Sequence, residues 1–522
     1  MTGPGVDVAA PVIEQQPVRR ELIFGLVAPL GVDKNKVIEA FKTCVKDARY
    51  DFVRIDTTEI IEEYRNRPKP HAESYLERKE ALMDAGDEMR ADWASHGDRR
   101  GDAVAIAAVF AIHEHRDSTS RSSPTMAAGD ARCYLIDSLK HPHELETLRS
   151  LYGPAFIAIA LYAPPAKRRE FLLLRARGQE RAVDALLDRD ARAPDDLGQR
   201  ASDAFYVCDF IVDATKDEYQ IERSLKRLFR LLFGDPHVTP TKQEMGMFLA
   251  RAAQARSGSL ARQIGAAILR DDGSVVSVGT NEVAKPITGG QYWAADDKRY
   301  HGRDRSYRLR DTSDEFRAEM VADALQRLAG SGALNDYYAA LDPTDRLNEL
   351  YFARSAPLRK SKIKDNIDYI RAVHAEGAAI IDAARAGVAT KGTTMYATVF
   401  PCHECARHIV AAGIKKVVYL APYPKSGVSR LYEDSIQVDP DVRSRHKVLF
   451  RTFRGVAPPR YLDLFTVGED ERKGPDGSPK TVDIETAAPQ LPYFTPDAGE
   501  VVFDEARLLA KYADSLRARR LL

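Results

Sequence analysis

The sequence predicts an α/β protein with two domains, and three observations support this fold class. The chain has 522 residues, which exceeds the size of one ordinary domain. Short apolar strand patterns alternate with amphipathic helical patterns over residues 20–235, as in a parallel α/β sheet. In the second half, Asp272-Gly273 lies between two strand patterns, which is a strong hairpin signal. We therefore expect one parallel α/β domain followed by an α/β domain that also contains antiparallel strands.

The first predicted domain begins after residues 1–19, which have no periodicity and are expected to be a disordered leader. An apolar strand at 22–27 leads into a glycine turn and then a helix with Val37, Ile38, Phe41 and Val45 on one face. A second strand follows at 51–56, so this segment predicts the βαβ unit that opens a parallel sheet. Further strands are expected at residues 131–136, 155–162 and 204–212, with helices at 102–115 and 168–188.

A turn-rich stretch at residues 232–240 marks the predicted boundary, and the second domain is expected to span residues 236–467. Its elements should be, in order, a helix at 241–257, a hairpin at 265–279, a polar insertion at about 285–370, a helix at 375–386, a strand at 394–399, a helix from Cys402 and a strand at 416–420. Residues 468–522 are expected to form a C-terminal extension with a charged loop at 468–478 and a helix at 503–521.

Composition excludes several classes of protein. Lys plus Arg and Asp plus Glu both total 77, so the basic bias of proteins that bind long polynucleotides is absent. Five scattered cysteines are too few for a disulfide framework, and no apolar run reaches the ~20 residues of a membrane span. We expect a cytoplasmic protein without a membrane partner.

Two short segments carry the chemistry: His374-Ala375-Glu376 and Pro401-Cys402-His403-Glu404-Cys405. Each lies at the start of a predicted helix, where the helix dipole favours thiolate. Cysteines at i and i+3 share one helix face, so Cys402 and Cys405 can reach one metal ion. With His374 they make three protein ligands and leave one tetrahedral position open, as in catalytic zinc sites. Glu376 is then placed to transfer protons, and the spacing H-x-E…P-C-x-x-C is the signature of zinc deaminases.

Each half of this pattern has a less specific interpretation. An isolated H-x-E occurs in many exposed helices, and an isolated C-x-x-C can be a redox pair or half of a structural zinc site. The chain contains no second cysteine pair to complete a structural site, and a redox pair would give no role to His374 and Glu376. The combination therefore favours one catalytic Zn²⁺.

On these residues the chain resembles the cytidine and deoxycytidylate deaminase superfamily. The segment from Arg262 to Ile268 looks like the first core strand of that family with its preceding basic residue. The resemblance implies that Asn281 contacts the nucleoside, that Thr398 lies beside the base and that the Ala375 N–H faces the cytosine O2.

A narrower resemblance is to the two-domain anti-phage dCTP deaminases, which join a P-loop kinase-like domain to a deaminase domain with a mixed sheet. It implies conversion of dCTP to dUTP with release of ammonia, which depletes the dCTP that a replicating phage needs. Relatives of the deaminase fold usually assemble as oligomers, so a homo-oligomer is expected. The segments that carry the narrower resemblance are Asp137–Pro142, Thr239–Thr241, Arg256-Ser257, Gly289–Trp293, Ala421–Ser426 and Gly455–Tyr461.

The triphosphate of such a substrate needs cations, and the candidates are Arg256, Arg262, Lys285 and Lys425. Each of them can equally be a solvated surface charge.

The first glycine turn, from Gly25 to Gly31, stands where a P-loop would, but it departs from the required pattern. Five residues separate the glycines instead of four, and Val32-Asp33 replaces the Lys-Ser/Thr that grips phosphate and magnesium. Kinase or ATPase turnover is therefore not expected. A degenerate nucleotide site, a surface for a regulatory RNA or protein, and a purely structural turn all remain open.

Three alternatives to dCTP deamination stay open from sequence. The nearest is a dCMP deaminase of pyrimidine nucleotide metabolism. A polynucleotide cytosine deaminase would need a basic, aromatic-lined channel, which the neutral composition disfavours. In the third hypothesis, the first domain binds a regulator and thereby controls the activity of the deaminase domain.

Overall fold

The computed structural model describes residues 21–65, 74–94, 101–122, 131–176, 178–191, 198–287, 289–291, 303, 309–359, 361–423, 426–468, 472–490 and 498–511. The expected leader at 1–19 lies outside the described residues. The chain divides into two compact units, Met1–Thr239 with Gly455–Leu522, and Pro240–Arg454. None of the described helices is long and apolar enough to cross a membrane.

The first unit contains an open six-stranded sheet with the strand order β14-β5-β4-β1-β3-β2, in which all pairs are parallel except β14 with β5. Its elements are β1 (Leu22–Val27), α1 (Asn35–Asp47), β2 (Asp51–Asp56), α2 (Thr57–Arg65), α3 (Tyr75–Ala94), α4 (Ala103–Ser122), β3 (Arg132–Asp137), α5 (Pro142–Tyr152), η1 (Gly153–Ala155), β4 (Phe156–Tyr162), α6 (Pro165–Ala176), α7 (Glu180–Ala191), α8 (Ala201–Tyr206), β5 (Phe210–Asp213), α9 (Glu218–Leu232), β14 (Gly455–Val456), η5 (Pro458–Arg460), α17 (Tyr461–Phe465) and α18 (Ala498–Lys511).

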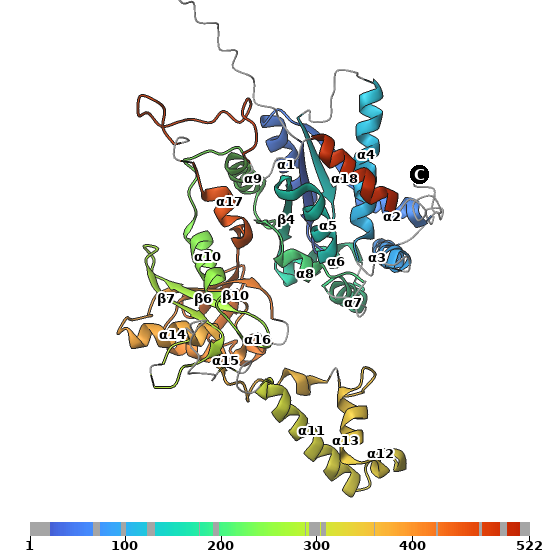
Figure 1. Ribbon diagram of the computed structural model, residues 1–522, viewed down its shortest axis with the longest axis vertical. Coiled ribbons are helices and arrows are strands. Elements are labelled where there is room, and N and C mark those ends of the chain that lie inside the picture. The colour runs from blue at the N-terminus through green and yellow to red at the C-terminus, as the bar shows by residue number, and fades with distance from the viewer. Residues whose placement is uncertain are drawn as a thin grey trace, which may run out of the picture. The chain divides into compact units, whose positions relative to one another are not determined.

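Helices cover both faces of this sheet, because successive side chains of its central strands are buried on opposite sides. On one face, Phe24 of β1 packs against Phe41 of α1 and Phe229 of α9, with ring centroids 4.8 and 5.8 Å away. Helices α4, α5 and α18 lie along the other face (Figure 1). The predicted parallel α/β domain is therefore present, whereas its assignment as P-loop kinase-like remains a prediction.

Two predicted elements of the first unit were wrong. Residues 204–212 were expected to form one strand, but residues 201–206 belong to α8 and only Phe210–Asp213 is strand. Apolar residues cluster densely here, and their pattern alone does not separate a buried helix from a buried strand. The single helix expected at 168–188 is two helices, α6 and α7, separated around Gly178, whose φ is +87°.

The second unit contains a mixed six-stranded sheet with the order β12-β13-β11-β10-β6-β7, as the resemblance implied. Strands β7, β6 and β10 pair antiparallel, and β10, β11, β13 and β12 pair parallel. Its elements are α10 (Lys242–Gln254), β6 (Gly265–Leu269), β7 (Val275–Thr280), β8 (Glu282–Val283), α11 (Thr312–Gly330), α12 (Asp336–Ala340), α13 (Pro343–Leu347), η3 (Asn348–Phe352), η4 (Lys362–Asp365), β9 (Ala372–Val373), α14 (Ala375–Arg385), β10 (Thr394–Val399), α15 (His403–Ala411), β11 (Lys416–Ala421), α16 (Val428–Leu431), β12 (Ile436–Val438) and β13 (Val448–Thr452).

Two glycines let helices approach this sheet closely. A Cβ at Gly265 of β6 would overlap the Ala250 carbonyl oxygen of α10, and a Cβ at Gly279 of β7 would overlap the Ala375 carbonyl oxygen of α14. Glycine at these positions therefore places the N-terminus of α14 directly against β7.

The insertion at 285–370 is partly helical. Its described part contains α11, α12, α13 and η3. Val321 and Leu325 of α11 form a small core with Leu350 and Tyr351 of η3, and partly buried side chains of α12 and α13 pack against it.

The expected extent of the second domain, 236–467, differs from the structure at its C-terminal end. Residues 455–467 belong to the first unit, because β14 pairs with β5 and the Ala457 N–H donates to the Asp209 carbonyl oxygen. The predicted terminal helix is present as α18, which begins at Ala498; residues 512–521 lie outside the described part of the chain.

Candidate active site

The two helices that carry the motif both begin at a residue predicted to bind the metal. His374 is the N-cap of α14 and follows β9, which pairs with β8. Cys402 is the N-cap of α15, and its sulfur accepts a hydrogen bond from the Cys405 N–H at 3.4 Å. Strand β10 precedes α15 in the centre of the sheet, and α14 packs against β7.

The structure brings His374, Cys402 and Cys405 together. Their potential ligand atoms all lie within 4.8 Å of one another. The Nδ1 atom of His374 is 3.3 Å from the Cys402 sulfur and 3.4 Å from the Cys405 sulfur. Zinc–sulfur and zinc–nitrogen bonds of about 2.3 and 2.0 Å in a tetrahedral site separate such donors by about 3.5 Å. This His/Cys/Cys group therefore fits Zn²⁺.

The protonation of the two cysteines also fits a dication. Hydrogen bonding from Cys405, together with the neighbouring His374, lowers the pKa of Cys402 to about 4. The same hydrogen bond and burial raise the pKa of Cys405 well above its ordinary value. The two shifts have opposite sign because each cysteine acts on the other, and a bound dication would favour the thiolate form of both.

Glu376 lies beside the three ligand residues in the first turn of α14. It is 4% exposed, and its Oε2 is 3.4 Å from the Cys405 sulfur. Burial, and secondarily the charge of Cys402, raise the pKa of Glu376. A buried carboxyl group with a raised pKa can hold a proton near neutral pH and release it.

A cavity of about 380 Å³ opens onto this group, and Glu376, His374 and Cys402 line it. Its aromatic wall is formed by Phe400 and Tyr423, and the guanidinium carbon of Arg262 lies 5.2 Å from the Tyr423 ring centroid. The cavity therefore offers a surface for a planar ring close to Glu376.

Two of the remaining predicted substrate residues line the cavity, and a third is buried beside it. Arg262 and Asn281 line the cavity. The Asn281 side chain accepts from the Ile264 N–H at 2.6 Å and donates to the Arg262 carbonyl oxygen at 2.7 Å, so it holds the cavity wall in place. Ala375 is fully buried in the first turn of α14.

Thr398 and two of the predicted cations are not among the residues that line the cavity. The Thr398 hydroxyl accepts from the Gly265 N–H at 3.1 Å and joins two strands, while the next residue, Val399, lines the cavity. Arg256 and Lys285 are described but are not among the lining residues, and Lys425 lies outside the described residues.

Sequence reasoning missed the contribution of the insertion. Asp311 and Thr312 at the start of α11 line the cavity, and so do Ile367 and Ile370 at the end of the insertion and Arg371 directly after it. Arg371 adds a second guanidinium to the wall. Its position three residues before His374 was the only local signal for this role.

Comparison with known proteins agrees with the site. Residues 240–421 match the family model described as the cytidine and deoxycytidylate deaminase zinc-binding region. The second unit contains a cytidine/deoxycytidylate deaminase domain.

Sequence relatives of this deaminase domain match only over short stretches. The deoxycytidylate deaminase of Enterobacteria phage T2 is 50% identical over 54 residues, which is 10% of this chain and 29% of that protein. The ComE operon protein 2 of Bacillus subtilis (strain 168) is 33% identical over 90 residues, 15% of this chain and 48% of that protein. The human deoxycytidylate deaminase is 40% identical over 63 residues, which is 12% of this chain and 34% of that protein. The chain thus matches less than half of the length of these relatives.

Among solved structures, the dCMP deaminase of cyanophage S-TIM5 in complex with dCMP and dUMP aligns with 15% identity and a TM-score of 0.22. The alignment covers 41% of this chain and 99% of that one.

Proposed function

We propose that the deaminase domain converts a deoxycytidine nucleotide, with dCTP as the first candidate, to the uridine nucleotide and ammonia. The observation that carries the proposal is the meeting of His374, Cys402 and Cys405 beside the buried Glu376 at a cavity with an aromatic wall. His374, Cys402 and Cys405 would hold zinc. Zinc bound there would supply Lewis-acid chemistry and make a hydroxide nucleophile available near neutral pH.

Glu376 moves the protons of this reaction. Its carboxylate accepts a proton from the attacking water and donates it to the cytosine N3 as the C4–O bond forms. A second transfer through Glu376 protonates the exocyclic amine, the C4–N bond breaks and ammonia leaves. Because water and the nucleotide are the only reactants, the reaction requires no redox partner.

The cavity wall offers two guanidinium groups to a phosphorylated substrate, beside the carboxyl groups of Asp311 and Glu376. Arg262 and Arg371 both line it, while Phe400 and Tyr423 offer ring contacts. The resemblance to anti-phage dCTP deaminases points to the triphosphate and to a role in depleting dCTP during phage replication.

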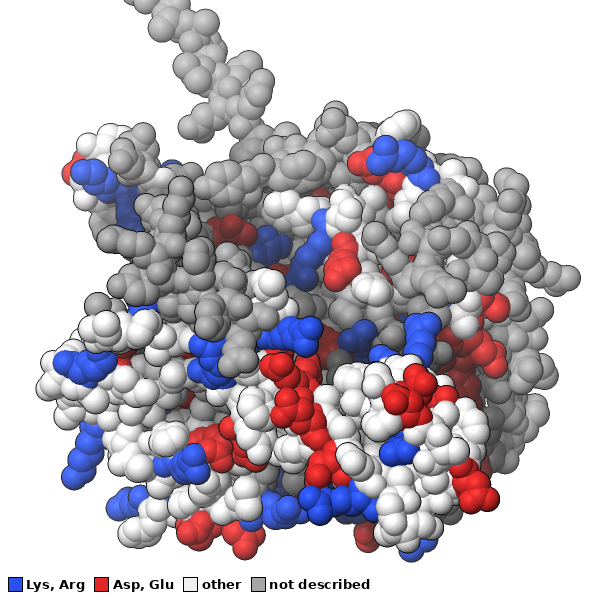
Figure 2. Space-filling model, turned by 60° about the horizontal axis from the view of Figure 1, so that its bottom comes forward, with Lys and Arg blue, Asp and Glu red and all other residues white. Residues whose placement is uncertain are grey.

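The second candidate is dCMP, and the names of the phage and human relatives favour it. A polynucleotide substrate is disfavoured by the zero net charge. On the face drawn in Figure 2, the described Lys and Arg side chains are interspersed with Asp and Glu and form no broad basic area.

A substrate panel tests the proposal. Zinc-loaded protein is incubated with dCTP, dCDP, dCMP, deoxycytidine and CTP, and loss of cytosine absorbance and release of ammonia are followed, with the Glu376→Gln variant as the blank. We expect the highest kcat/KM with dCTP. A higher value with dCMP would select the second candidate, and no deamination of any of the five compounds would refute the proposed chemistry.

A further inference from the structure

The first unit contains a cavity of its own, of about 360 Å³, at the carboxyl edge of its parallel sheet. The lining begins directly after β1 with Ala28, after β2 with Thr57 and after β3 with Ser138. Open parallel sheets bind ligands at this edge, because the loops that leave the strands diverge there. The cavity therefore lies where the topology favours a binding site.

Positive charge dominates the wall of this cavity. Lys34, Lys79, Lys140 and Arg175 line it, against the two carboxylates of Asp33 and Asp190. Lys34 donates to Asp137 at 2.8 and 2.9 Å, and Lys140 donates to Asp190 at 2.7 Å, so both of these ammonium groups are already paired.

Lys79 is different. Within the described part of the chain, no carboxylate lies within ion-pair distance of its ammonium group. Burial, and then the charges of Lys34 and Lys140, lower the pKa of Lys79. An anion in the cavity would relieve both the desolvation and the repulsion.

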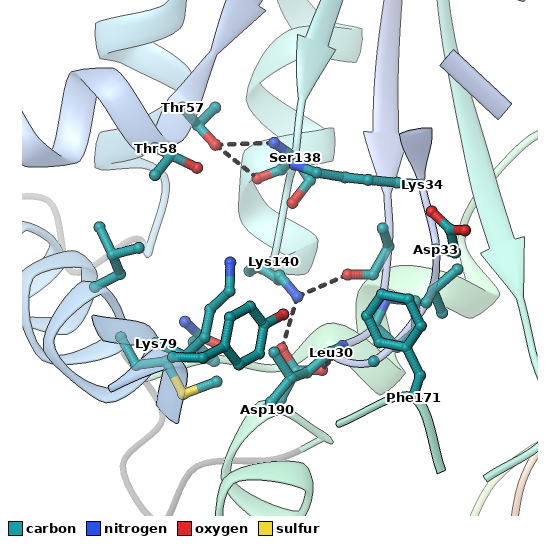
Figure 3. A pocket seen from close by; sticks show the side chains of 18 of the residues that line it. Leu30, Asp33, Lys34, Thr57, Thr58, Lys79, Ser138, Lys140, Phe171 and Asp190 are labelled. Carbon is teal, nitrogen blue, oxygen red and sulfur yellow. Dashed lines mark hydrogen bonds and ion pairs between the residues drawn. The ribbon is translucent and has the colours of Figure 1, made fainter. Parts of the chain in front are cut away.

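The glycine turn does not offer the Leu30 amide to a ligand. The Leu30 N–H donates to the Asp190 Oδ2 at 2.7 Å, and the other oxygen of this fully buried carboxylate accepts from Lys140. Asp190 therefore occupies the hydrogen-bonding position that the Leu30 N–H would otherwise offer to a phosphate. Figure 3 shows Thr57, Thr58 and Ser138 on one side of the cavity and Leu30, Asp190 and Phe171 on the other. A ligand phosphate must therefore bind away from the turn, towards Lys79.

The rest of the wall is suited to a planar apolar group. Tyr75 and Phe171 line the cavity together with Ile61, Leu82 and Met83. The Arg175 guanidinium lies 3.6 Å from the Phe171 ring centroid, and Lys79 lies 5.6 Å from the Tyr75 centroid. Aromatic rings and cations in this arrangement match a ligand that joins a ring system to phosphates.

We propose that this cavity binds a nucleotide, with its phosphates at Lys79 beside Lys34 and its base against Tyr75 and Phe171. The site is separate from the zinc-ligand group and does not depend on the proposed deaminase chemistry. Asp190 excludes the phosphates from the glycine turn, so that the nucleotide binds without the phosphate cradle of a P-loop.

Isothermal titration calorimetry of the full chain tests the proposal. The Glu376→Gln background prevents turnover, and the probes are ATP, GTP, dTTP and pyrophosphate, none of which contains cytosine. We expect at least one of the three nucleotides to bind, and Lys79→Ala to weaken that binding by tenfold or more. Lys42→Ala, which removes an exposed lysine of α1, is the matched control and should leave the affinity unchanged.

Three outcomes would overturn the proposal: none of the nucleotides binds, Lys79→Ala binds as tightly as the parent, or pyrophosphate binds as tightly as the best nucleotide. Melting temperatures without ligand check that the variants fold. Lys79→Ala should not melt lower than the parent, because it removes a desolvated charge, and Lys79→Gln serves as a second variant if it does.

Discussion

At the residue scale, the candidate active site combines three potential metal ligands with one buried carboxyl group beside them. His374, Cys402 and Cys405 point donor atoms at a common centre, whereas Glu376 touches that group but is surplus to a three-ligand site. In the absence of metal, burial lowers the pKa of His374, but the hydrogen bond and charge of Cys402 outweigh it, so the net shift is upward.

Glu376→Gln should abolish proton transfer without loss of metal. We expect kcat to fall by about 10²–10⁴-fold, because the amide cannot accept the proton of water. Zinc content, measured by atomic absorption, should stay at the parental value. Glu404→Gln is the control, since this half-exposed carboxylate pairs with Arg407 on the surface of α15. Full activity of Glu376→Gln would refute the assigned role.

Cys402→Ala should lose zinc as well as activity. Two remaining ligands hold zinc much more weakly than three, so a colorimetric chelator should remove the metal far faster than from the parent. Cys208→Ala removes another buried thiol, in the first unit, and should retain zinc. Equal zinc retention by the two variants would contradict the ligand assignment.

Nucleotide binding at Lys79 should depend on pH. The lowered pKa of Lys79 means that its charge is lost as pH rises through a value below the ordinary 10.5, and binding that needs this charge weakens in the same range. Titrations at increasing pH should show this loss in the parent and not in Lys79→Arg, whose guanidinium stays protonated. The charged groups that act on Lys79 are Lys34, Lys140, Arg78 and Asp56.

At the scale of elements, a short C-terminal strand completes the first sheet. Asp209, just before β5, accepts from the Ala158 N–H at 2.7 Å and from Arg149 at 3.0 Å, and its carboxylate lies 3.4 Å from the Arg460 Nε. Arg460 in turn donates to the carbonyl oxygens of Pro154 and Phe156. One buried carboxylate thus joins β4, α5 and the segment that follows β14.

Asp209→Ala should therefore destabilise the first unit. Loss of a charged acceptor leaves the Ala158 N–H and two guanidinium groups short of a partner, which costs about 2–3 kcal/mol. Urea unfolding followed by circular dichroism measures the change. Asp463→Ala is the control. The Asp463 carboxylate also contacts Arg460, at 3.5 Å, but its side chain is 35% exposed, so its loss leaves no buried group without a partner. If Asp209→Ala lowers the free energy of unfolding by no more than Asp463→Ala does, the contacts of Asp209 do not stabilise the first unit.

At the scale of the whole molecule, the last described helix returns to the first unit. Glu505 of α18 is fully buried and accepts from Arg116 of α4, which also pairs with Glu21 at 2.7 Å. Glu21 and Glu505, near the two ends of the described chain, therefore both form ion pairs with the buried Arg116.

Glu505→Ala should lower the stability of the first unit by about 2–3 kcal/mol, because it removes a charged acceptor from a buried guanidinium that keeps Glu21 as its partner. Thermal and urea unfolding of the full chain should both report this loss. Asp504→Ala removes a half-exposed carboxylate from the same helix and should change stability by less than about 0.5 kcal/mol. A change below 1 kcal/mol in Glu505→Ala would contradict the importance of α18.

The sequence determined the features that depend on local pattern. The βαβ opening, the hairpin around Gly273 and the two helix starts at His374 and Cys402 all follow from periodicity, turn residues and spacing within a few residues. The residues of the deaminase motif could be named for the same reason.

Only the tertiary structure decided which distant segments meet. It placed residues 455–467 with the first sheet and Arg371 in the wall of the candidate-site cavity. It also paired the Thr398 hydroxyl of β10 with β6, and the Asp190 carboxylate of α7 with the Leu30 N–H of the glycine turn. Apart from the position of Arg371 three residues before His374, these contacts join residues far apart in the chain, and the pairing depends on packing and hydrogen bonding of the folded chain. A periodic pattern reports which face of an element is buried, but not which partner covers it.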